Sequence, residues 1–431
     1  MGRLTTAVMV SLWAIPVSML LNRIVPQPYM DEIFHIPQAQ QYCQGNFQSW
    51  DPMITTPPGL YGLSLAYIAS LFPGKWILNL SQSDLCTTPI LRSTNVVLAI
   101  ICSILVRAIV MHLRPGMTEG KATLYAIFVG LYPVHWFFTF LYYTDVASLA
   151  AVLAMYLSCL KKNFWFSAMF GAVAVLCRQT NIIWVIFVAA NGAISLIGDI
   201  IAICKTFWYV KWRVLVAFTP FAFVLAAFGA FVFLNGGIVL GAKEAHVVSP
   251  HFSQILYFGL VSAAAAFPLH FSPNHAKPNF FFCFLTVKFF KIVFEFSSIA
   301  HPYLLADNRH YTFYIWRRLI QAHWSIKYAL IPLYVYSWFS ILTTLGKEQK
   351  SIWVLSYCIS VALVLVPAPL IEFRYFTIPL VLLIIHSPIM SQRNLLLLSF
   401  VYAVVNALTM ALFLFRPFHW AHEHGTQRFM W

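Results

Sequence analysis

The sequence has 431 residues and a formal net charge of +14, with 61% hydrophobic residues and only 9% charged residues. A soluble domain is about half apolar and about a quarter charged, so this composition excludes a soluble globular protein and predicts a polytopic membrane protein. The basic residues lie in short clusters between apolar runs. That pattern is typical of cytoplasmic loops beside anionic membrane lipid and argues against nucleic acid as a partner. We therefore expect one all-α membrane-embedded unit, residues 1–431.

The apolar runs predict about twelve to fourteen transmembrane helices, because a spanning helix needs about 20 apolar residues. The run 4–21 follows Arg3 and lacks a convincing cleavage site, so we interpret it as a signal anchor and first span. Segment 59–72 is either a further span or a helix on the membrane surface. Segment 279–298 is ambiguous because it carries Lys288, Lys291 and Glu295 on one helical face. The other expected spans are 89–111, 122–141, 145–160, 164–178, 181–203, 214–234, 253–271, 328–345, 351–367, 375–390 and 395–415.

The basic loops predict the orientation of these spans. The clusters around Arg107, Lys161, Lys205, Lys347 and Arg393 alternate with less basic loops and are therefore expected on the cytoplasmic side. The opposite face, which is the lumen in a eukaryotic endomembrane, then holds a large first loop at 22–88 and four shorter segments. These segments are 142–145, 235–251, 301–318 and 372–375.

The first luminal loop contains the acidic pair Asp31 and Glu32, with His35 one helical turn beyond Asp31. Two interpretations are open. In one, a carboxylate is a general base acting on a sugar hydroxyl. In the other, the pair lies in the first turn of a short helix and interacts with its dipole. Pro37 argues against a helix that continues past it.

Two further acids lie on the same predicted face. Asp51 sits between Trp50 and Pro52 in a proline-rich turn, and we expect a turn-forming role with a contact to the acceptor as the alternative. Asp145 follows Tyr142-Tyr143-Thr144 at the start of a span. It could hold a metal or an acceptor hydroxyl, but capping of the next helix by Thr144 or Asp145 is the more common reason for such an acid.

The segment from His301 to Tyr311 gathers His301, Asp307, Arg309 and His310 in an otherwise apolar region. Arginine presents a fork of donors suited to phosphate, so the segment predicts a site for a lipid-linked phosphate, with Asp307 orienting Arg309. A structural ion pair that caps a helix is the competing interpretation. Glu372 and Arg374 show the same ambiguity, and their i,i+2 spacing predicts that each reaches a different partner.

The eight cysteines show no zinc-binding spacing, and we predict no metal site. Most cysteines lie in apolar runs, as small buried side chains do. Cys43 and Cys86 both fall in polar stretches and could pair in an oxidising lumen. A histidine cluster at His419, His422 and His424 is interpreted as incidental.

Several stretches of the chain resemble one family, the endoplasmic-reticulum α-1,2-glucosyltransferases that use dolichyl-phosphate glucose. The resemblance runs from the first span to the last residue and is most specific in the string His301–Tyr311. The other stretches that carry it are Tyr29–Gln40, Trp50–Thr56, Gly236–Val239, Glu372–Tyr375 and Arg428–Trp431.

The resemblance implies a multi-span fold of the C class of glycosyltransferases, in the endoplasmic-reticulum membrane with a luminal active site. It implies transfer of glucose, with inversion, from dolichyl phosphate β-D-glucose to a diglucosylated dolichyl-diphosphate-linked oligosaccharide. No nucleotide cofactor is needed because dolichyl phosphate already activates the sugar, and the need for a metal stays open.

The resemblance also implies roles for individual residues. Asp31 matches the family's first-loop base, with Glu32 as the immediate alternative. His301, Arg309, His310 and Arg374 are expected to hold the donor phosphate. The residues expected near the acceptor or behind these groups are His35, Asp51, Asp145, Asp307 and Glu372. One departure is Ala242, where the resemblance would place an acid.

Two other classes are considered beside an enzyme: a polytopic transporter, and a non-enzymatic membrane partner such as a channel regulator. A transporter is expected to place polar residues near the bilayer midplane and to show internal repeats. Here the polar segments gather at one predicted face and no repeat is visible, which favours the enzyme.

Overall fold

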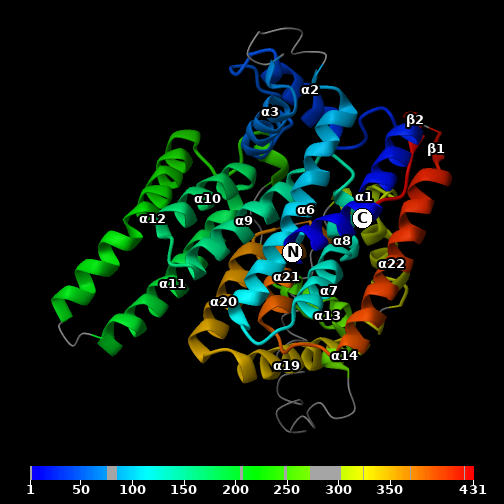
Figure 1. The fold of residues 1–431 in the computed structure, drawn as a ribbon. Helices are drawn as coiled ribbons and strands as arrows, with labels where there is room; N and C mark the ends of the chain where they lie inside the picture. Colours follow the sequence, from blue (N-terminus) through cyan, green and yellow to red (C-terminus); the bar gives the residue numbers. More distant parts are fainter. Residues whose placement is uncertain are drawn as a thin grey trace. The chain divides into compact units, whose positions relative to one another are not determined.

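The computed structural model describes residues 2–74, 85–203, 207–246, 250–271, 302–323, 325–368, 370–421 and 423–431. The chain forms two compact units, Met1–His246 and Val247–Trp431. Figure 1 shows the labelled elements, which are nearly all helical. The prediction of an all-α protein is therefore confirmed.

The first unit consists of ten helices in the described residues and two short 3-10 helices, at Gln179–Asn181 and Lys243–His246. The helices are α1 (Gly2–Ile24), α2 (Glu32–Cys43), α3 (Gly59–Leu71), α6 (Thr88–Leu113), α7 (Glu119–Gly130), α8 (Pro133–Phe138), α9 (Thr144–Leu160), α10 (Phe164–Cys177), α11 (Ile182–Ile203) and α12 (Phe207–Asn235).

The second unit continues with helices and ends in a two-stranded antiparallel sheet. Its described elements are α13 (Ser253–Ala265), α14 (Phe267–His270), α16 (Pro302–Ala306), α17 (Tyr311–Ile315), a π-helical turn (Trp316–Ile320), α18 (Ile326–Ala329), α19 (Ile331–Glu348), α20 (Ser351–Leu365), a 3-10 helix (Phe373–Phe376), α21 (Thr377–His386), α22 (Gln392–Phe415), β1 (Phe418–Trp420) and β2 (Glu423–Gln427).

Helix α1 shows why these elements belong in a bilayer. Its apolar side chains at Leu4, Leu12 and Met19 are exposed, while small or polar side chains such as Thr6 and Ser18 are buried. Such a helix turns its apolar face to lipid and packs its small residues against other helices. Among the described residues, five helices are long and apolar enough to cross a membrane: α1, α6, α11, α12 and α22.

The expected spans agree with the observed helices, with differences at prolines. The expected span 122–141 is two helices, α7 and α8, because Pro133 begins a new helix at its first turn. Likewise 253–271 is divided into α13 and α14, which begins just before Pro268. Segment 59–72 is the helix α3, while the expected span 279–298 lies outside the described residues. The total of twelve to fourteen spans and the single-unit organisation stay predictions.

Pro37 does not end α2, so the sequence-based expectation was wrong there. The helix runs on to Cys43, and Pro37 and Ile33 both lie on its exposed side. The carbonyl of Ile33, which loses its helical donor at Pro37, therefore lies on the side of the helix that is not packed.

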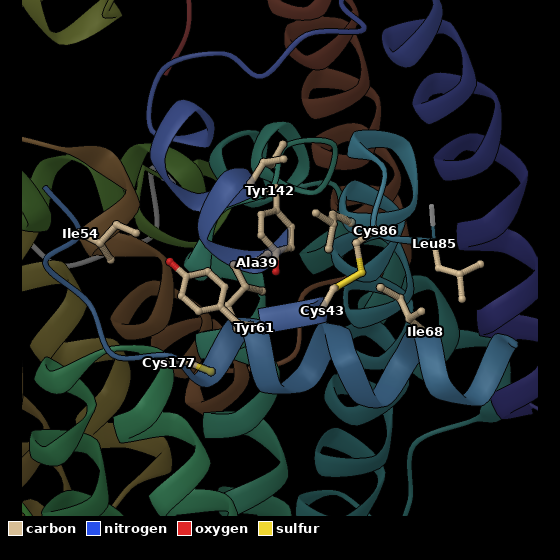
Figure 2. Close-up of a cluster of buried hydrophobic side chains, with 13 residues drawn as sticks. Ala39, Cys43, Ile54, Tyr61, Ile68, Leu85, Cys86, Tyr142 and Cys177 are labelled. Carbon is tan, nitrogen blue, oxygen red and sulfur yellow. A yellow bond between two sulfur atoms is a disulfide. The ribbon is translucent and has the colours of Figure 1, made fainter. Parts of the chain in front are cut away.

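A hydrophobic core in the first unit joins α2 and α3 to α6, α9 and α10. Ala39, Cys43 and Tyr61 meet Tyr142 and Cys177 in this core (Figure 2). Gly59 lets α3 approach α10, since a Cβ there would lie 2.4 Å from the Leu176 carbonyl carbon. The first loop is thus packed against the helices rather than detached from them.

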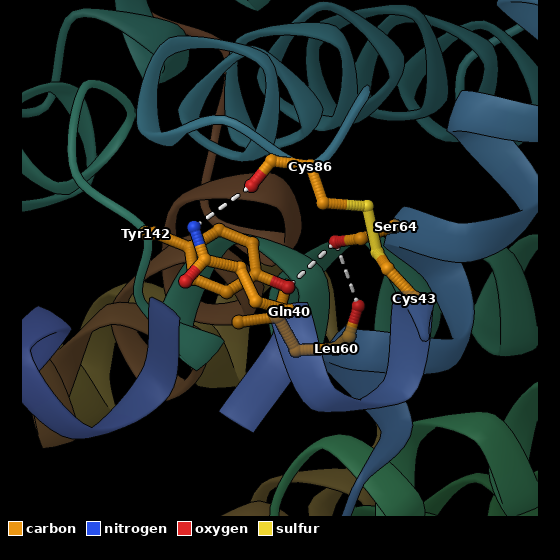
Figure 3. Close-up of a disulfide and its surroundings, with 6 residues drawn as sticks. All are labelled: Gln40, Cys43, Leu60, Ser64, Cys86 and Tyr142. Carbon is orange, nitrogen blue, oxygen red and sulfur yellow. Dashed lines mark hydrogen bonds between the residues drawn. A yellow bond between two sulfur atoms is a disulfide. The ribbon is translucent and has the colours of Figure 1, made fainter. Parts of the chain in front are cut away.

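A disulfide between Cys43 and Cys86 closes this part of the first loop, with Cα atoms 6.6 Å apart (Figure 3). Beside it the Gln40 amide donates a 3.1 Å hydrogen bond to the Cys86 carbonyl. The hydroxyls of Ser64 and Tyr142 lie 2.7 Å apart and tie α3 to the segment before α9. The predicted cysteine pair is confirmed.

Candidate active site

The acidic pair lies where α2 begins. Met30 has a φ of +56°, which is uncommon for a residue other than glycine and turns the chain sharply before the helix. Asp31 is the N-cap of α2 and is partly exposed, while Glu32 begins the first turn and is fully buried. The two neighbouring carboxylates therefore occupy different environments.

Glu32 is at the centre of a buried hydrogen-bond network. Its carboxylate forms an ion pair with Arg92 of α6, with contacts of 2.9 Å to Nε and 2.6 Å to Nη2, and neither side chain is exposed. The backbone N–H groups of Tyr29 and Tyr142 donate to the same carboxylate at 3.0 and 2.6 Å. A buried carboxylate in such a network has its lone pairs directed at fixed donors.

Arg92 extends this network to the end of α1. Its guanidinium donates to the carbonyls of Val25 and Gln27 and to the Asn22 side chain, at 2.6, 3.0 and 3.0 Å. Arg92 is not among the site residues predicted from the sequence. The signal was present, since a charged residue near the start of a long apolar run must find partners.

Two segments that are distant in sequence meet at Asp31. The Tyr143 hydroxyl accepts a hydrogen bond from the Asp31 backbone N–H at 3.2 Å. Asn95 of α6 donates to the carbonyls of Leu141 and Tyr143 at 2.6 and 2.8 Å, which holds the Tyr143 segment in place. Tyr143 is a second residue that the sequence analysis did not assign to the site.

Asp145 is the second residue of α9, in the first turn of the helix. Tyr143 is the N-cap, so the prediction that Thr144 or Asp145 caps the helix was wrong. Arg178 binds this first turn, with its Nη1 3.0 Å from Asp145 and its Nε donating to the Thr144 hydroxyl at 3.1 Å. Arg178, the residue directly after α10, therefore supplies the positive charge that neutralises Asp145.

His35 and Asp51 are held by neighbours in the first loop. His35 Nδ1 lies 2.6 Å from the Tyr61 hydroxyl of α3. Gln38 accepts from the Asp51 backbone N–H at 2.9 Å, and one Asp51 oxygen accepts from the Met53 N–H at 2.9 Å. The Asp51 geometry is that of a side chain that stabilises its own turn.

The glycine-rich loop after α12 packs on this same turn. Ala242 donates to the Pro52 carbonyl at 3.0 Å and Leu240 to the Thr55 carbonyl at 3.2 Å. A Cβ on Gly241 would lie only 2.2 Å from the Pro52 oxygen, so this position accepts no side chain without movement of the backbone. The loop therefore belongs to the same polar end of the unit as Asp51.

In the second unit, Asp307 and Arg309 form a forked ion pair between α16 and α17. Arg309 Nε and Nη2 lie 2.9 and 2.7 Å from the two Asp307 oxygens. Burial raises the pKa of Asp307, but the Arg309 hydrogen bonds and the charge of His310 outweigh it and hold the pKa below its ordinary value. The expected orientation of Arg309 by Asp307 is present.

Glu372 and Arg374 pair with each other, so the prediction that each reaches a different partner was wrong. Arg374 Nη2 donates to Glu372 at 3.0 Å, and its Nε lies 2.5 Å from the other oxygen. Glu372 has extended backbone angles and precedes a 3-10 helix. In extended backbone, residues i and i+2 lie on one face, which is why the spacing permits an ion pair.

Residues 418–431 join these two ion pairs. The backbone of Met430 pairs with Arg309 and Tyr311, at 2.9 and 3.1 Å. The ring of Trp431 lies against Tyr311 and Phe373, with centroids 5.2 and 6.0 Å away. Residues 428–431 carry part of the family resemblance but were not predicted to lie at the site.

His301 lies outside the described residues, so its predicted role stays a prediction. Among the residues that the structure describes, no group of three or more His, Cys, Asp or Glu side chains could hold a metal ion.

The predicted luminal segments gather within each unit. In the first unit, the segments around Asp31, Asp51, Tyr143, Arg178 and Leu240 contact one another. In the second unit, the contacts through Met430 and Trp431 join the Arg309 and Arg374 segments.

The predicted cytoplasmic loops also contact each other within each unit. Arg107 donates to Glu119 in the first unit, and a Cβ on Gly2 would meet both of these side chains. In the second unit, Gln349 donates to the His386 carbonyl at 3.4 Å. These contacts join segments that the basic loops predict to lie on the cytoplasmic side, and the sidedness itself stays a prediction.

Fold and site together define a polytopic helical membrane protein with acidic and cationic clusters gathered in its loops. The sequence model of the DIE2/ALG10 family matches residues 25–385, and the chain belongs to this family. No solved structure matches the chain.

Named relatives match nearly the whole chain. A protein of Arabidopsis thaliana named as a Dol-P-Glc:Glc(2)Man(9)GlcNAc(2)-PP-Dol α-1,2-glucosyltransferase is 50% identical, in an alignment that covers 100% of both chains. Proteins with the same name in Homo sapiens and Yarrowia lipolytica are each 34% identical over 95% of this chain and 94% of their own.

Proposed function

We propose that this chain transfers glucose from dolichyl phosphate β-D-glucose, in α-1,2 linkage, to Glc2Man9GlcNAc2-PP-dolichol. This would be the last step in assembly of the oligosaccharide used for asparagine-linked glycosylation. The observation that carries the proposal is the 50% identity to a relative of that name over the full length of both chains. Relatives from plant, animal and yeast bear one name, which favours an enzyme over a transporter or a channel regulator.

The proposed mechanism is a single displacement. The 2-hydroxyl oxygen of the acceptor's terminal glucose attacks the anomeric carbon of the donor, on the face opposite the phosphate. The new carbon–oxygen bond forms as the bond to phosphate breaks, and the electron pair leaves with dolichyl phosphate. The hydroxyl proton passes to a carboxylate base, and the β linkage of the donor becomes an α linkage.

Asp31 is the proposed base. Its neighbour Glu32 is completely buried, with its carboxylate bound to Arg92 and to two backbone N–H groups. Protonation of Glu32 would weaken all of these contacts, and acceptor sugar cannot reach a fully buried carboxylate without unpacking α2. Asp31 is partly exposed at the N-cap, where an acceptor hydroxyl can approach it.

Arg309 and Arg374, with His301 and His310, are the proposed ligands of the donor phosphate. Both guanidinium groups use the Nε edge to bind a carboxylate two residues earlier, so their planes are fixed before substrate arrives. Fixed charge at the position of the leaving group is usually a large catalytic term. The proposed roles of His35, Asp51, Asp145, Asp307 and Glu372 are to hold these groups or the acceptor.

We place the polar ends that carry Asp31 and Arg309 in the lumen of the endoplasmic reticulum. The Cys43–Cys86 disulfide supports this orientation, because disulfides persist in oxidising compartments and not in the cytosol. The bases at Arg107 and Lys347 would then lie on the cytoplasmic side.

The test of the proposed function uses purified full-length protein, synthetic dolichyl phosphate glucose and a diglucosylated lipid-linked acceptor, with and without EDTA. Wild-type protein is expected to form a triglucosylated product with an α-1,2 linkage. Asp31→Asn is expected to lose activity by at least about 100-fold, the scale of a missing general base. Glu119→Gln, a matched change in an exposed acid, should keep full activity.

No product from folded wild-type protein would reject the function. Normal turnover by Asp31→Asn would reject Asp31 as the base but would leave the proposed function standing. Loss of activity with EDTA would show that a metal is needed.

A further inference from the structure

Residues 418–431 make direct contact with the guanidinium group of Arg309. Gln427 of β2 accepts a hydrogen bond from Arg309 Nη1 at 3.0 Å. The ring of Trp420 in β1 lies under the same group, with 4.7 Å from the guanidinium carbon to the ring centroid. Arg309 is therefore held on one edge by Asp307, on another by Gln427, and on one face by Trp420.

The same segment fixes the backbone on both sides of Arg309. The Trp420 indole N–H donates to the Asn308 side chain at 2.9 Å. The Trp431 carbonyl lies 3.1 Å from His310 Nδ1, and Met430 pairs with the backbone of Arg309 and Tyr311. The β1–β2 hairpin follows α22 (Figure 1). Trp420 and Gln427 of the hairpin, together with Met430 and Trp431, contact every residue of the stretch 308–311.

Gln427 is chemically suited to orient a cation without neutralising it. Its side chain is buried, with 5% of the residue exposed, and it presents a neutral amide oxygen to Arg309. An acid at this position would form a second ion pair with the guanidinium and weaken its attraction for phosphate. Asp307 already supplies one carboxylate, so a second one would leave Arg309 with excess negative charge around it.

We infer that Gln427 and Trp420 of the β1–β2 hairpin belong to the donor site as positioning residues, which aim Arg309 at the phosphate of the donor. This inference rests on the proposed function and extends it to a segment that lies more than 100 residues from Arg309 in the sequence. The contact of Trp431 with Phe373 connects the segment to Arg374 as well.

The test compares Gln427→Glu with Thr426→Glu. Both variants add one negative charge to β2 at adjacent positions, but Thr426 is exposed and Gln427 faces Arg309. Initial rates are measured with dolichyl phosphate glucose and diglucosylated acceptor, each varied in turn. Gln427→Glu is expected to raise the donor KM about tenfold or more, the scale of a charged hydrogen bond, with the acceptor KM unchanged. Thr426→Glu should leave both constants unchanged.

Two further variants separate positioning from folding. Gln427→Met removes the amide oxygen that accepts the hydrogen bond from Arg309, without adding charge. It should raise the KM for dolichyl phosphate glucose less than Gln427→Glu does. Trp420→Phe keeps a ring under Arg309 and should retain a lower donor KM than Trp420→Leu. Equal changes in the KM values for donor and acceptor would overturn the inference. So would variants that yield less folded protein but keep the wild-type KM for the donor. Inactive wild-type protein would instead reject the proposed function.

Discussion

At the scale of the residue, Glu32 and Asp31 illustrate how adjacent carboxylates acquire different roles. Glu32 is buried against Arg92, whereas Asp31 stays partly exposed at the helix N-cap. Both are acids beside an apolar run, so the sequence alone left them as alternatives. Their difference arises from α6, which brings Arg92 to Glu32 from 60 residues away.

The Glu32–Arg92 pair gives a prediction for stability. Glu32→Gln leaves a buried guanidinium without its counter-ion, a change that costs about 3–5 kcal/mol. We expect the unfolding temperature in detergent to fall by more than about 5 °C, with activity lost as α2 shifts. Glu32→Gln with Arg92→Met should recover part of the stability.

Asp31→Asn is the matched control for this prediction, because it changes the neighbouring acid by the same atom. It should keep the wild-type unfolding temperature while losing activity. A Glu32→Gln protein as stable as the wild type would contradict the structural role of the pair.

Asp307 gives a prediction for pH. Its pKa in the folded protein is held below the ordinary value by Arg309 and His310 despite burial. The unfolded value is about 3.9. The ion pair therefore stabilises the fold fully above that pH, and its contribution is lost as the pH falls through the folded pKa.

The measurement is the unfolding temperature of wild type and Asp307→Asn as a function of pH in detergent. The wild type should be more stable near neutral pH, and its advantage should shrink once the pH falls below about 4. An advantage that persists unchanged at about pH 3 would show that the depressed pKa is not the source of the stabilisation.

At the scale of the element, the loop after α12 depends on a close approach that only glycine permits. A Cβ on Gly241 would overlap the carbonyl oxygens of Pro52 and Ile54, at 2.2 and 2.6 Å, whereas a Cβ on Gly237 would meet no atom within 4 Å. Gly241→Ala must therefore move the loop away from the Asp51 turn.

We expect Gly241→Ala to lower stability by about 1–3 kcal/mol, the scale of overpacking, and to reduce activity. Gly237→Ala in the same loop should stay within about 0.5 kcal/mol of the wild type. Thermal unfolding in detergent and initial rates measure both effects. Equal behaviour of the two variants would contradict the packing of this loop on residues 52–55.

The helices were predictable from the sequence because apolar runs of sufficient length form spans in a bilayer. Helices α6, α11, α20 and α22 agree with the expected spans to within a few residues. The errors fall at positions where local rules compete with packing. Pro37 was expected to stop α2, and Glu372 was expected to reach past Arg374.

The candidate site was predictable in its parts and not in its connections. The polar clusters around Asp31, Arg309 and Arg374 stand out because charge is rare in this chain. Arg92, Trp420 and Gln427 did not stand out, because their importance depends on tertiary contacts that local sequence spacing does not reveal. Such contacts can be identified only from the three-dimensional structure.

At the scale of the whole molecule, the alternation of polar ends leads to a prediction about sidedness. Each unit groups its predicted luminal segments together, and its predicted cytoplasmic loops also contact one another. Because α22 begins beside Arg393 and ends before β1, residues 418–431 should lie on the same side of the membrane as Arg309.

Single cysteines at exposed positions test this sidedness in sealed microsomes. In a background without the unpaired cysteines, Gln48→Cys and Thr426→Cys should react with a membrane-impermeant maleimide only after permeabilisation. Lys161→Cys and Lys350→Cys, exposed at the opposite predicted ends, should react in intact vesicles. Labelling of Thr426→Cys in intact vesicles, with Gln48→Cys protected, would place β2 and Asp31 on opposite sides. A single luminal site could then not combine Asp31 as base with Arg309 as phosphate ligand, and the proposed mechanism would fail.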